Sequence, residues 1–155
     1  MSKTKLSNLV SSLKLLEQNP EKTDYFENFE DIICRIGALR DPESISILIQ
    51  FLKDESDELD LMWGIIHTIE IFDDAIYIEE ILKTSSDLYK NSPEWSLIVF
   101  MRIINSAECK TELIRQLRKS SHSVKNTIKK IMEEINNESP EFLAKTVPVT
   151  LATTI

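Results

Sequence analysis

Glycine is almost absent from this chain of 155 residues, which contains only Gly37 and Gly64. Phosphate-binding loops, tight β-hairpins and nucleophile elbows depend on glycine, because glycine adopts positive φ angles at no steric cost. The chain therefore has almost no material for these motifs. This scarcity favours an all-helical fold.

Cysteine and histidine are also scarce, with two of each. Cys34 and Cys109 lie far apart in the sequence, which predicts reduced thiols rather than a disulfide framework. His67 and Glu70 are three residues apart on one helix face, as a metal site or an acid–base pair would require. Nothing in the sequence completes such a site, so we interpret His67 as a structural or interface residue. We expect no catalytic, cofactor or metal site, and a protein that is not an enzyme.

Basic residues are outnumbered, with 18 Lys and Arg against 26 Asp and Glu, for a formal net charge of −8. An acidic protein repels nucleic-acid phosphates, so direct nucleic-acid binding is not expected. The charge is uneven, because twelve carboxylates and one basic residue, Lys53, lie between Asp41 and Glu80. This asymmetry predicts a basic partner. The alternative is a solvated face that keeps a small helical domain in solution.

Long apolar runs are missing as well. No run is long enough for a signal peptide or a membrane span. We therefore expect a cytoplasmic protein with no membrane partner, and leave its oligomeric state open.

Apolar residues recur with helical spacing along most of the chain. We predict helices over residues 6–18, 25–39, 42–53, 57–72, 75–82 with an extension to 90, 93–105, 108–119, 123–137 and 141–145. Eight or nine helices over residues 1–145 fit a single all-α domain, because this length supports one well-packed core. Residues 146–155 are uncharged and rich in β-branched side chains with Pro148 among them, which predicts an extended or disordered tail.

Residues 38–74 contain the clearest unit, a helical hairpin with an acidic turn. Asp41 is a typical N-cap and Pro42 a typical first helical residue. After the turn at residues 54–57, Ser56 or Asp57 can cap the next helix. This pattern resembles a HEAT-type repeat, which implies stacked antiparallel helical hairpins.

An internal repeat is suggested by a spacing of 32 residues, which pairs Trp63 with Trp95 and Glu70 with Arg102. The helical segments 111–119 and 123–137 form a third, weaker copy. Repeats of this length are typical of stacked hairpins, each of which buries its face against its neighbours. The alternative is a chance similarity between amphipathic helices.

This register places two polar and aromatic stripes side by side on a concave surface. The stripes comprise Trp63, His67 and Glu70, and Trp95, Val99 and Arg102. We expect Glu70 to pair with Arg102. The alternative is that both tryptophans fill the core, because large aromatic residues dominate cores as well as interfaces.

Residues 51–106 also resemble a bacterial family of helical immunity proteins, immunity protein 30, encoded beside polymorphic or contact-dependent toxins. The points of resemblance are Asp57-Glu58, Ile66 to Glu70, Phe72-Asp73, Tyr77, Ser92-Pro93, Trp95 and Met101 to Asn105. The resemblance implies a protein that binds and neutralises a cognate toxin domain, in a contact-dependent growth inhibition or polymorphic toxin system.

We expect that toxin to be a basic nuclease domain, because an acidic inhibitor can cover a basic substrate groove by mimicking phosphate charge. The rival hypothesis is a HEAT-like adaptor for another protein complex. A third hypothesis is a helical-repeat DNA glycosylase, which needs a basic groove. The predicted partner-binding residues are Asp54, Glu55, Asp57, Glu58, Asp60, Trp63, His67, Glu70, Asp73, Asp74, Tyr77, Glu80, Trp95 and Arg102.

Overall fold

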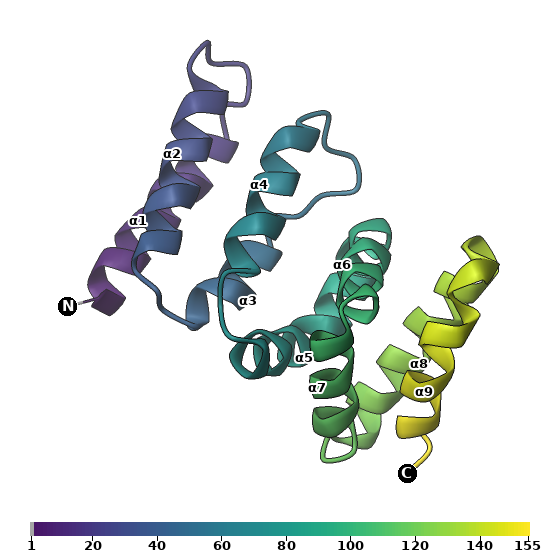
Figure 1. Ribbon diagram of the computed structural model, residues 1–155. Coiled ribbons are helices and arrows are strands. Elements are labelled where there is room, and N and C mark those ends of the chain that lie inside the picture. The colour runs from purple at the N-terminus through teal and green to yellow at the C-terminus, as the bar shows by residue number, and fades with distance from the viewer. Residues whose placement is uncertain (1) are drawn as a thin grey trace. The chain divides into compact units, whose positions relative to one another are not determined.

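Helices form nearly all the secondary structure of residues 2–155, the part of the chain that this computed structural model describes (Figure 1). The α-helices are α1 (Ser2–Glu17), α2 (Tyr25–Ala38), α3 (Glu43–Ile49), α4 (Leu59–Ile69), α5 (Asp74–Asn91), α6 (Pro93–Asn105), α7 (Ala107–Leu117), α8 (His122–Glu138) and α9 (Leu143–Ala152). A 3-10 turn, η1 (Pro140–Phe142), precedes α9. These described residues contain no strand, and the all-α prediction is confirmed. No helix among them is both long and apolar enough to cross a membrane.

The helices divide into two compact units, one ending at Phe72 and the other beginning at Asp73. In the first unit α1 runs antiparallel to α2, and α4 packs against both α2 and α3 (Figure 1). The buried positions of α2 and α4 recur 32 residues apart. They pair Phe29 with Leu61, Ile33 with Ile65 and Gly37 with Ile69. This shared burial pattern is the one expected of two equivalent helices in successive hairpins.

The two glycines of the first unit have contrasting surroundings. A Cβ atom built on Gly37 in α2 would lie 2.9 Å from Cγ2 of Thr68 in α4, whereas one built on Gly64 would meet nothing within 4 Å. The Thr68 hydroxyl donates to the Gly64 carbonyl oxygen at 2.7 Å, which holds the Thr68 side chain in place. Gly37 therefore permits a close approach of α2 and α4.

The turn between α2 and α3 combines a left-handed residue with a side-chain cap. Arg40 has a φ of 55°, and its N–H donates to the Gly37 carbonyl oxygen at 3.1 Å. The Glu43 N–H donates to Oδ1 of Asp41 at 3.0 Å. Asp41 thus acts as the predicted cap, but α3 begins at Glu43, one residue later than predicted. This helix also ends at Ile49 rather than residue 53, because residues 50–52 form tight i→i−3 turns.

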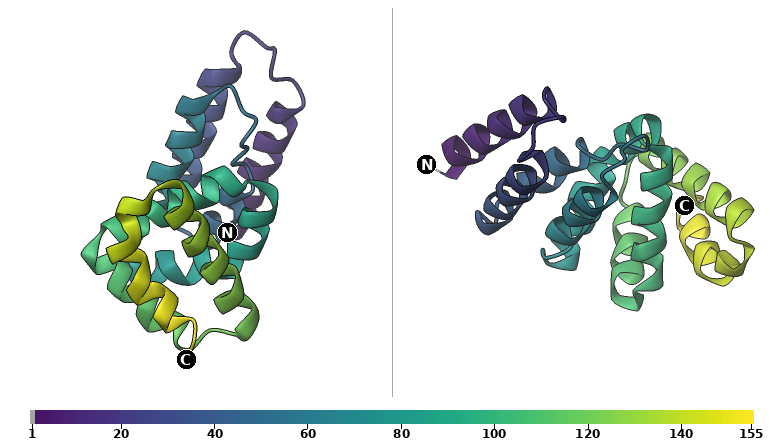
Figure 2. Two further views of the ribbon diagram at one scale, coloured as in Figure 1. Left: turned by 90° about the vertical axis from the view of Figure 1, so that its right-hand side faces the viewer. Right: turned by 90° about the horizontal axis from the view of Figure 1, so that it is seen from above.

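In the second unit α5 packs against α6, α7 and α8, and α9 packs against α6, α7 and α8 (Figure 2). α7 packs mainly against α5 and α6, and α8 packs mainly against α5 and α9, rather than against each other. The predicted third hairpin, made from α7 and α8, is therefore wrong as a packing unit. Its apolar residues do reach the core, where Leu113, Leu117, Ile128 and Ile135 are fully buried.

The prediction of an extended or disordered tail from residue 146 is wrong for the helix α9. Its Thr146, Val149 and Ala152 side chains are buried with helical spacing. The Thr146 hydroxyl contacts Oδ1 of Asn136 in α8 at 2.6 Å, which satisfies the polar group that α9 buries. Packing of one face against α8 and its neighbours outweighs the low helix propensity of the β-branched residues.

The 32-residue register between α4 and α6 is also wrong, by two residues. The buried positions of these helices match at a spacing of 34, which pairs Leu61 with Trp95, Met62 with Ser96, Ile65 with Val99, Ile66 with Phe100 and Ile69 with Ile103. Two residues correspond to about 200° around an α-helix. Trp63 and Trp95 therefore occupy different faces of their helices: Trp63 is half-buried, and Trp95 is only 4% exposed.

Hydroxyl side chains inside the helices bond mainly to their own backbone. Ser85 donates to the Leu82 carbonyl oxygen at 2.9 Å, and Ser96 donates to the Pro93 carbonyl oxygen at 2.6 Å. Both serines are buried. The preceding helical turn thus satisfies these hydroxyl groups without a partner from another helix.

Candidate functional site

The segment that connects α3 to α4 in the first unit is held by two hydrogen bonds from its backbone N–H groups to side chains. The Lys53 N–H donates to Sδ of Met62 at 3.3 Å, and the Glu58 N–H donates to Oγ of Ser56 at 3.1 Å. Met62 is buried, so the turn is tied to the core at its start. The prediction that Ser56 or Asp57 caps the next helix is wrong, because α4 begins at Leu59 with Glu58 at its N-cap position and no side-chain cap bond, and Ser56 bonds only within the turn.

The predicted carboxylates of this turn point largely to solvent. The side chains of Glu55, Asp57, Glu58 and Asp60 are exposed, and Asp54 is half-buried. We call these five residues the acidic turn. Because they lie within seven positions of each other, they concentrate negative charge at one end of the first unit.

The connection from α1 to α2 lies at the same end of this unit (Figure 1). Burial raises the pKa of the Glu17 carboxyl, and the nearby Lys53 ammonium partly opposes this effect. Burial also raises the pKa of the Tyr25 hydroxyl, with further contributions from the negative charges of Glu17 and Glu58. Glu58 of the acidic turn therefore acts electrostatically on Tyr25 at the start of α2, and Lys53, which precedes the turn, acts on Glu17 at the end of α1.

Beside the acidic turn, α4 carries an aromatic pair. The rings of Trp63 and His67 have centroids 6.1 Å apart and planes inclined by 32°. His67 is exposed, whereas Trp63 and Glu70 are half-buried. Their shared face follows from spacings of three and four residues, as predicted. Over residues 2–155, no group of three or more His, Cys, Asp or Glu residues is arranged to hold a metal ion.

The remaining predicted site residues belong to the second unit and have mixed surroundings. Asp73, Asp74 and Arg102 are exposed, and Oδ1 of Asp74 accepts a bond from Sγ of Cys109 at 3.1 Å. Tyr77 is only 3% exposed. Tyr77 is therefore not an accessible partner-binding residue, and Trp95 and Val99 are buried rather than members of an exposed stripe. This agrees with the core-filling alternative for Trp95.

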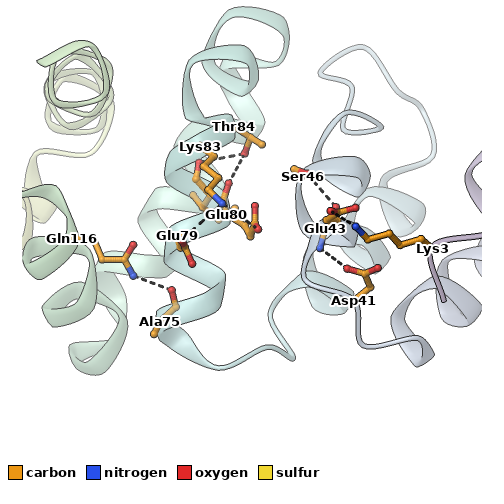
Figure 3. Close-up of polar contacts among 11 residues, drawn as sticks. Lys3, Asp41, Glu43, Ser46, Ala75, Glu79, Glu80, Lys83, Thr84 and Gln116 are labelled. Atoms are coloured by element: carbon orange, nitrogen blue, oxygen red, sulfur yellow. Dashed lines mark hydrogen bonds and ion pairs between the residues drawn. The ribbon is translucent and has the colours of Figure 1, made fainter. Parts of the chain in front are cut away.

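Glu80 lies on α5 and pairs within its own helix. Nζ of Lys83 lies 3.6 Å from Oε1 of Glu80 and 3.8 Å from Oε1 of Glu79 (Figure 3). The Glu80 side chain is 12% exposed and that of Glu79 is 61% exposed. Glu79, which the sequence analysis did not select, is thus the more accessible carboxylate.

Sequence reasoning also missed a polar cluster on α7. Hydrogen bonds from Arg115 and Gln116 lower the pKa of the Glu112 carboxyl to about 2. Gln116 also donates to the Ala75 carbonyl oxygen at 2.9 Å, which joins α7 to α5 (Figure 3). An open cavity of about 380 Å³ adjoins the cluster and is lined by Ala75, Glu79, Arg115, Gln116, Lys119 and Ser120. Only the three-residue spacing of Glu112 and Arg115 signals this cluster in the sequence.

The predicted acidic surface is thus distributed over two units. The acidic turn, Trp63, His67 and Glu70 belong to the first unit, and Asp73, Asp74 and Glu80 belong to the second. Each unit displays exposed carboxylates, while a continuous acidic face stays a prediction. Glu70 and Arg102 belong to different units, so their expected pairing also stays a prediction. The 32-residue register on which that pairing was based is wrong.

Comparison with protein families gives one result. Residues 13–113 match the model of a family described as immunity protein 30. The matched segment begins within α1 and ends within α7, so it contains the acidic turn and the aromatic pair of α4. Comparisons with curated proteins and with solved structures gave no match.

Proposed function

This chain belongs to the immunity protein 30 family, and we propose that it binds a cognate toxin domain tightly and thereby neutralises it. We further propose that the toxin is a nuclease with a basic substrate groove, and that the immunity protein covers this groove or the active site. In this proposal it acts in the cytoplasm by binding rather than by catalysis, within a contact-dependent or polymorphic toxin system.

The observation that carries the proposed mode of binding is the acidic turn. Four of its five carboxylate side chains are exposed, and the turn is anchored to the buried Met62. A cluster of negative charge accelerates the encounter with a basic surface and orients the two proteins. A cluster held in place also loses less conformational entropy on binding than a mobile one. The acidic turn therefore suits the first contact with a basic toxin domain.

The Trp63 and His67 pair lies next to this charge, one and two helical turns after Asp60. Interface residues that contribute most to affinity are often aromatic and lie beside charged residues that steer association. We therefore propose that Trp63 and His67 provide the apolar contact, while the acidic turn provides the long-range attraction. On the second unit we propose the exposed Asp73, Asp74 and Arg102 as further partner-binding residues.

Protection from the toxin tests the function directly. The toxin domain encoded beside this gene would be expressed in a sensitive strain with and without the immunity protein. We expect restored growth, a stable complex of the two purified proteins and loss of nuclease activity on DNA or RNA in that complex. A toxin that is neutralised but has no nuclease activity would refute the substrate class only. Failure to protect or to bind any neighbouring toxin would favour the HEAT-like adaptor.

Charge reversal tests the acidic turn. Changing Glu55, Asp57 and Glu58 together to lysine should slow association about 10-fold or more and weaken its dependence on salt. A matched control reverses Asp87, Glu138 and Glu141, three exposed carboxylates of the second unit. Stopped-flow association at two salt concentrations gives the rates. Equal slowing by the two triple variants would show that net charge, rather than the acidic turn, controls the encounter.

A further inference from the structure

The last helix carries a row of exposed apolar side chains that no part of the proposed function uses. Leu143, Val147 and Leu151 of α9 are 54%, 42% and 59% exposed, and Ile155 after the helix is 75% exposed. A spacing of four residues places Leu143, Val147 and Leu151 along one side of the helix, and Ile155 follows Leu151 by four residues. We call these four residues the α9 row. The face formed by Thr146, Val149 and Ala152 is buried, so the row faces away from the core.

Exposed apolar side chains are concentrated in the α9 row. It contains four of the seven large hydrophobic residues that are exposed in the described part of the chain. Single exposed apolar residues are normal on protein surfaces, but a contiguous row is typical of an interaction site.

The charges around the row indicate which partner it fits. No carboxylate side chain occurs between Phe142 and Ile155, and the single charged side chain of this segment is Lys145. Lys145 bonds to Oδ1 of Asn105, and its Nζ lies 5.3 Å from the centroid of the Phe142 ring. These contacts hold the cation beside the helices rather than along the row. A basic toxin domain therefore finds no electrostatic attraction here.

A second copy of the chain fits this surface better. Each copy has a net charge of −8, so two copies repel each other over most of their surfaces. Residues 142–155 have no acidic side chain, so two copies can approach along α9 with less of that repulsion. A two-fold axis would also match the row to itself, because a two-fold interface uses the same patch on both copies.

We propose that the α9 row joins two copies of this protein in an antiparallel helix pair. The two-fold axis passes near Val147, so that Leu143 of each copy contacts Leu151 of the other. The exposed fractions correspond to roughly 400 Å² of apolar surface on each copy, the size of a functional patch. Two copies would together bury about 800 Å² of this surface, less than the roughly 1,200 Å² of the smaller stable interfaces, which implies a weak dimer.

Sedimentation equilibrium of the full chain, without toxin, tests this proposal. The wild-type protein should dimerise with a Kd on the order of tens of micromolar, as small interfaces do. Leu151→Asp should weaken dimerisation about 100-fold, because it removes two apolar contacts per dimer and introduces two charges. Leu15→Asp is the matched control, since Leu15 on α1 is 64% exposed and lies outside the row. It should dimerise as the wild type does, and circular dichroism would verify that both variants are folded.

A charge-swap variant tests the antiparallel arrangement. Leu143→Lys and Leu151→Glu should each prevent dimerisation alone. The double variant should dimerise again, because the lysine introduced at position 143 then faces the glutamate introduced at position 151 of the other copy. In a parallel pair, like charges would meet and the double variant would stay monomeric.

Three results would overturn the proposal: a wild-type protein that is monomeric at several hundred micromolar, a folded Leu151→Asp variant that dimerises normally, or a double variant that does not recover. A monomeric wild type combined with reduced toxin binding by Leu151→Asp would instead assign the row to the toxin interface. Because dimerisation is measured without toxin, failure of the proposed function would leave this test unaffected.

Discussion

Replacing each glycine by alanine provides a stringent test of how the first unit packs. Both glycines lie within helices, Gly37 in α2 and Gly64 in α4. Only Gly37 faces a close neighbour, because a Cβ atom there would lie 2.9 Å from Cγ2 of Thr68. The same substitution therefore has opposite consequences at the two positions.

Alanine in a helix interior is more favourable than glycine by about 1 kcal/mol. At Gly64 nothing opposes this gain, so Gly64→Ala should raise the free energy of unfolding by about 0.5–1 kcal/mol. At Gly37 the added methyl group must displace Thr68, whose hydroxyl is bonded to Gly64 at 2.7 Å. Overpacking of a core costs about 1–3 kcal/mol, so Gly37→Ala should lower stability by up to about 2 kcal/mol.

Urea denaturation followed by circular dichroism would measure both effects. Thr68→Ser removes Cγ2 and keeps the hydroxyl group, so it should relieve the clash with alanine at position 37. In the double-mutant cycle, Gly37→Ala in the Thr68→Ser background should regain about 1–2 kcal/mol of the loss. The variant at position 64 is the matched control for helix propensity.

Two results would contradict this prediction: a Gly37→Ala variant as stabilised as Gly64→Ala, or a Thr68→Ser background in which the cost of Gly37→Ala is unchanged. Either result would show that α2 and α4 do not approach as closely as the structure indicates.

Three further predictions concern backbone strain and ionisation. Arg40→Gly should stabilise by about 0.5–1 kcal/mol in urea denaturation, because its φ of 55° suits glycine, whereas Arg40→Ala should give no gain. The pKa of Glu112 is lowered to about 2 in the folded state, so its stabilisation is present above the usual value of 4.5 and is lost as pH falls toward 2. Glu112→Gln should therefore flatten stability over this acidic range and cost less than about 1 kcal/mol at pH 7, because solvent screens the pair; an unchanged acid profile would contradict this. The pKa of Glu17 is raised above 4.5 by burial, so its ionisation destabilises the folded state as pH rises past that value. Glu17→Gln should consequently stabilise the protein at pH 7 but have little effect at pH 4, and equal effects at both pH values would exclude this explanation.

Local patterns predicted most of the helices. Pro93–Asn105 was predicted at its observed bounds, because Pro93 starts the helix and the apolar residues after it keep a helical period. The prediction failed at α9, where composition suggested an extended tail. Its β-branched residues form a helix because α9 buries Val149 in the second unit and α8 provides a partner for the Thr146 hydroxyl, which no local pattern records.

The candidate site was predictable where it depended on local exposure and not where it depended on packing. Acidic residues in a short turn are exposed, as Glu55 and Asp57 are. The match between Trp63 and Trp95 was misleading, because residue identity does not reveal which helix face is buried. A shift of two residues rotates the face by about 200°, and only the burial of Trp95 shows it.

The hydroxyl groups that bond to their own helices affect which substitutions this protein can tolerate. A hydrogen bond from Ser85 to Leu82, or from Ser96 to Pro93, moves with its helix and does not depend on a neighbour. Volume and shape, rather than polar pairing, therefore dominate the fit at these positions. Substitutions in the acidic turn can accumulate without breaking those bonds, so the surface that we propose for toxin binding can diverge while the helical core is retained.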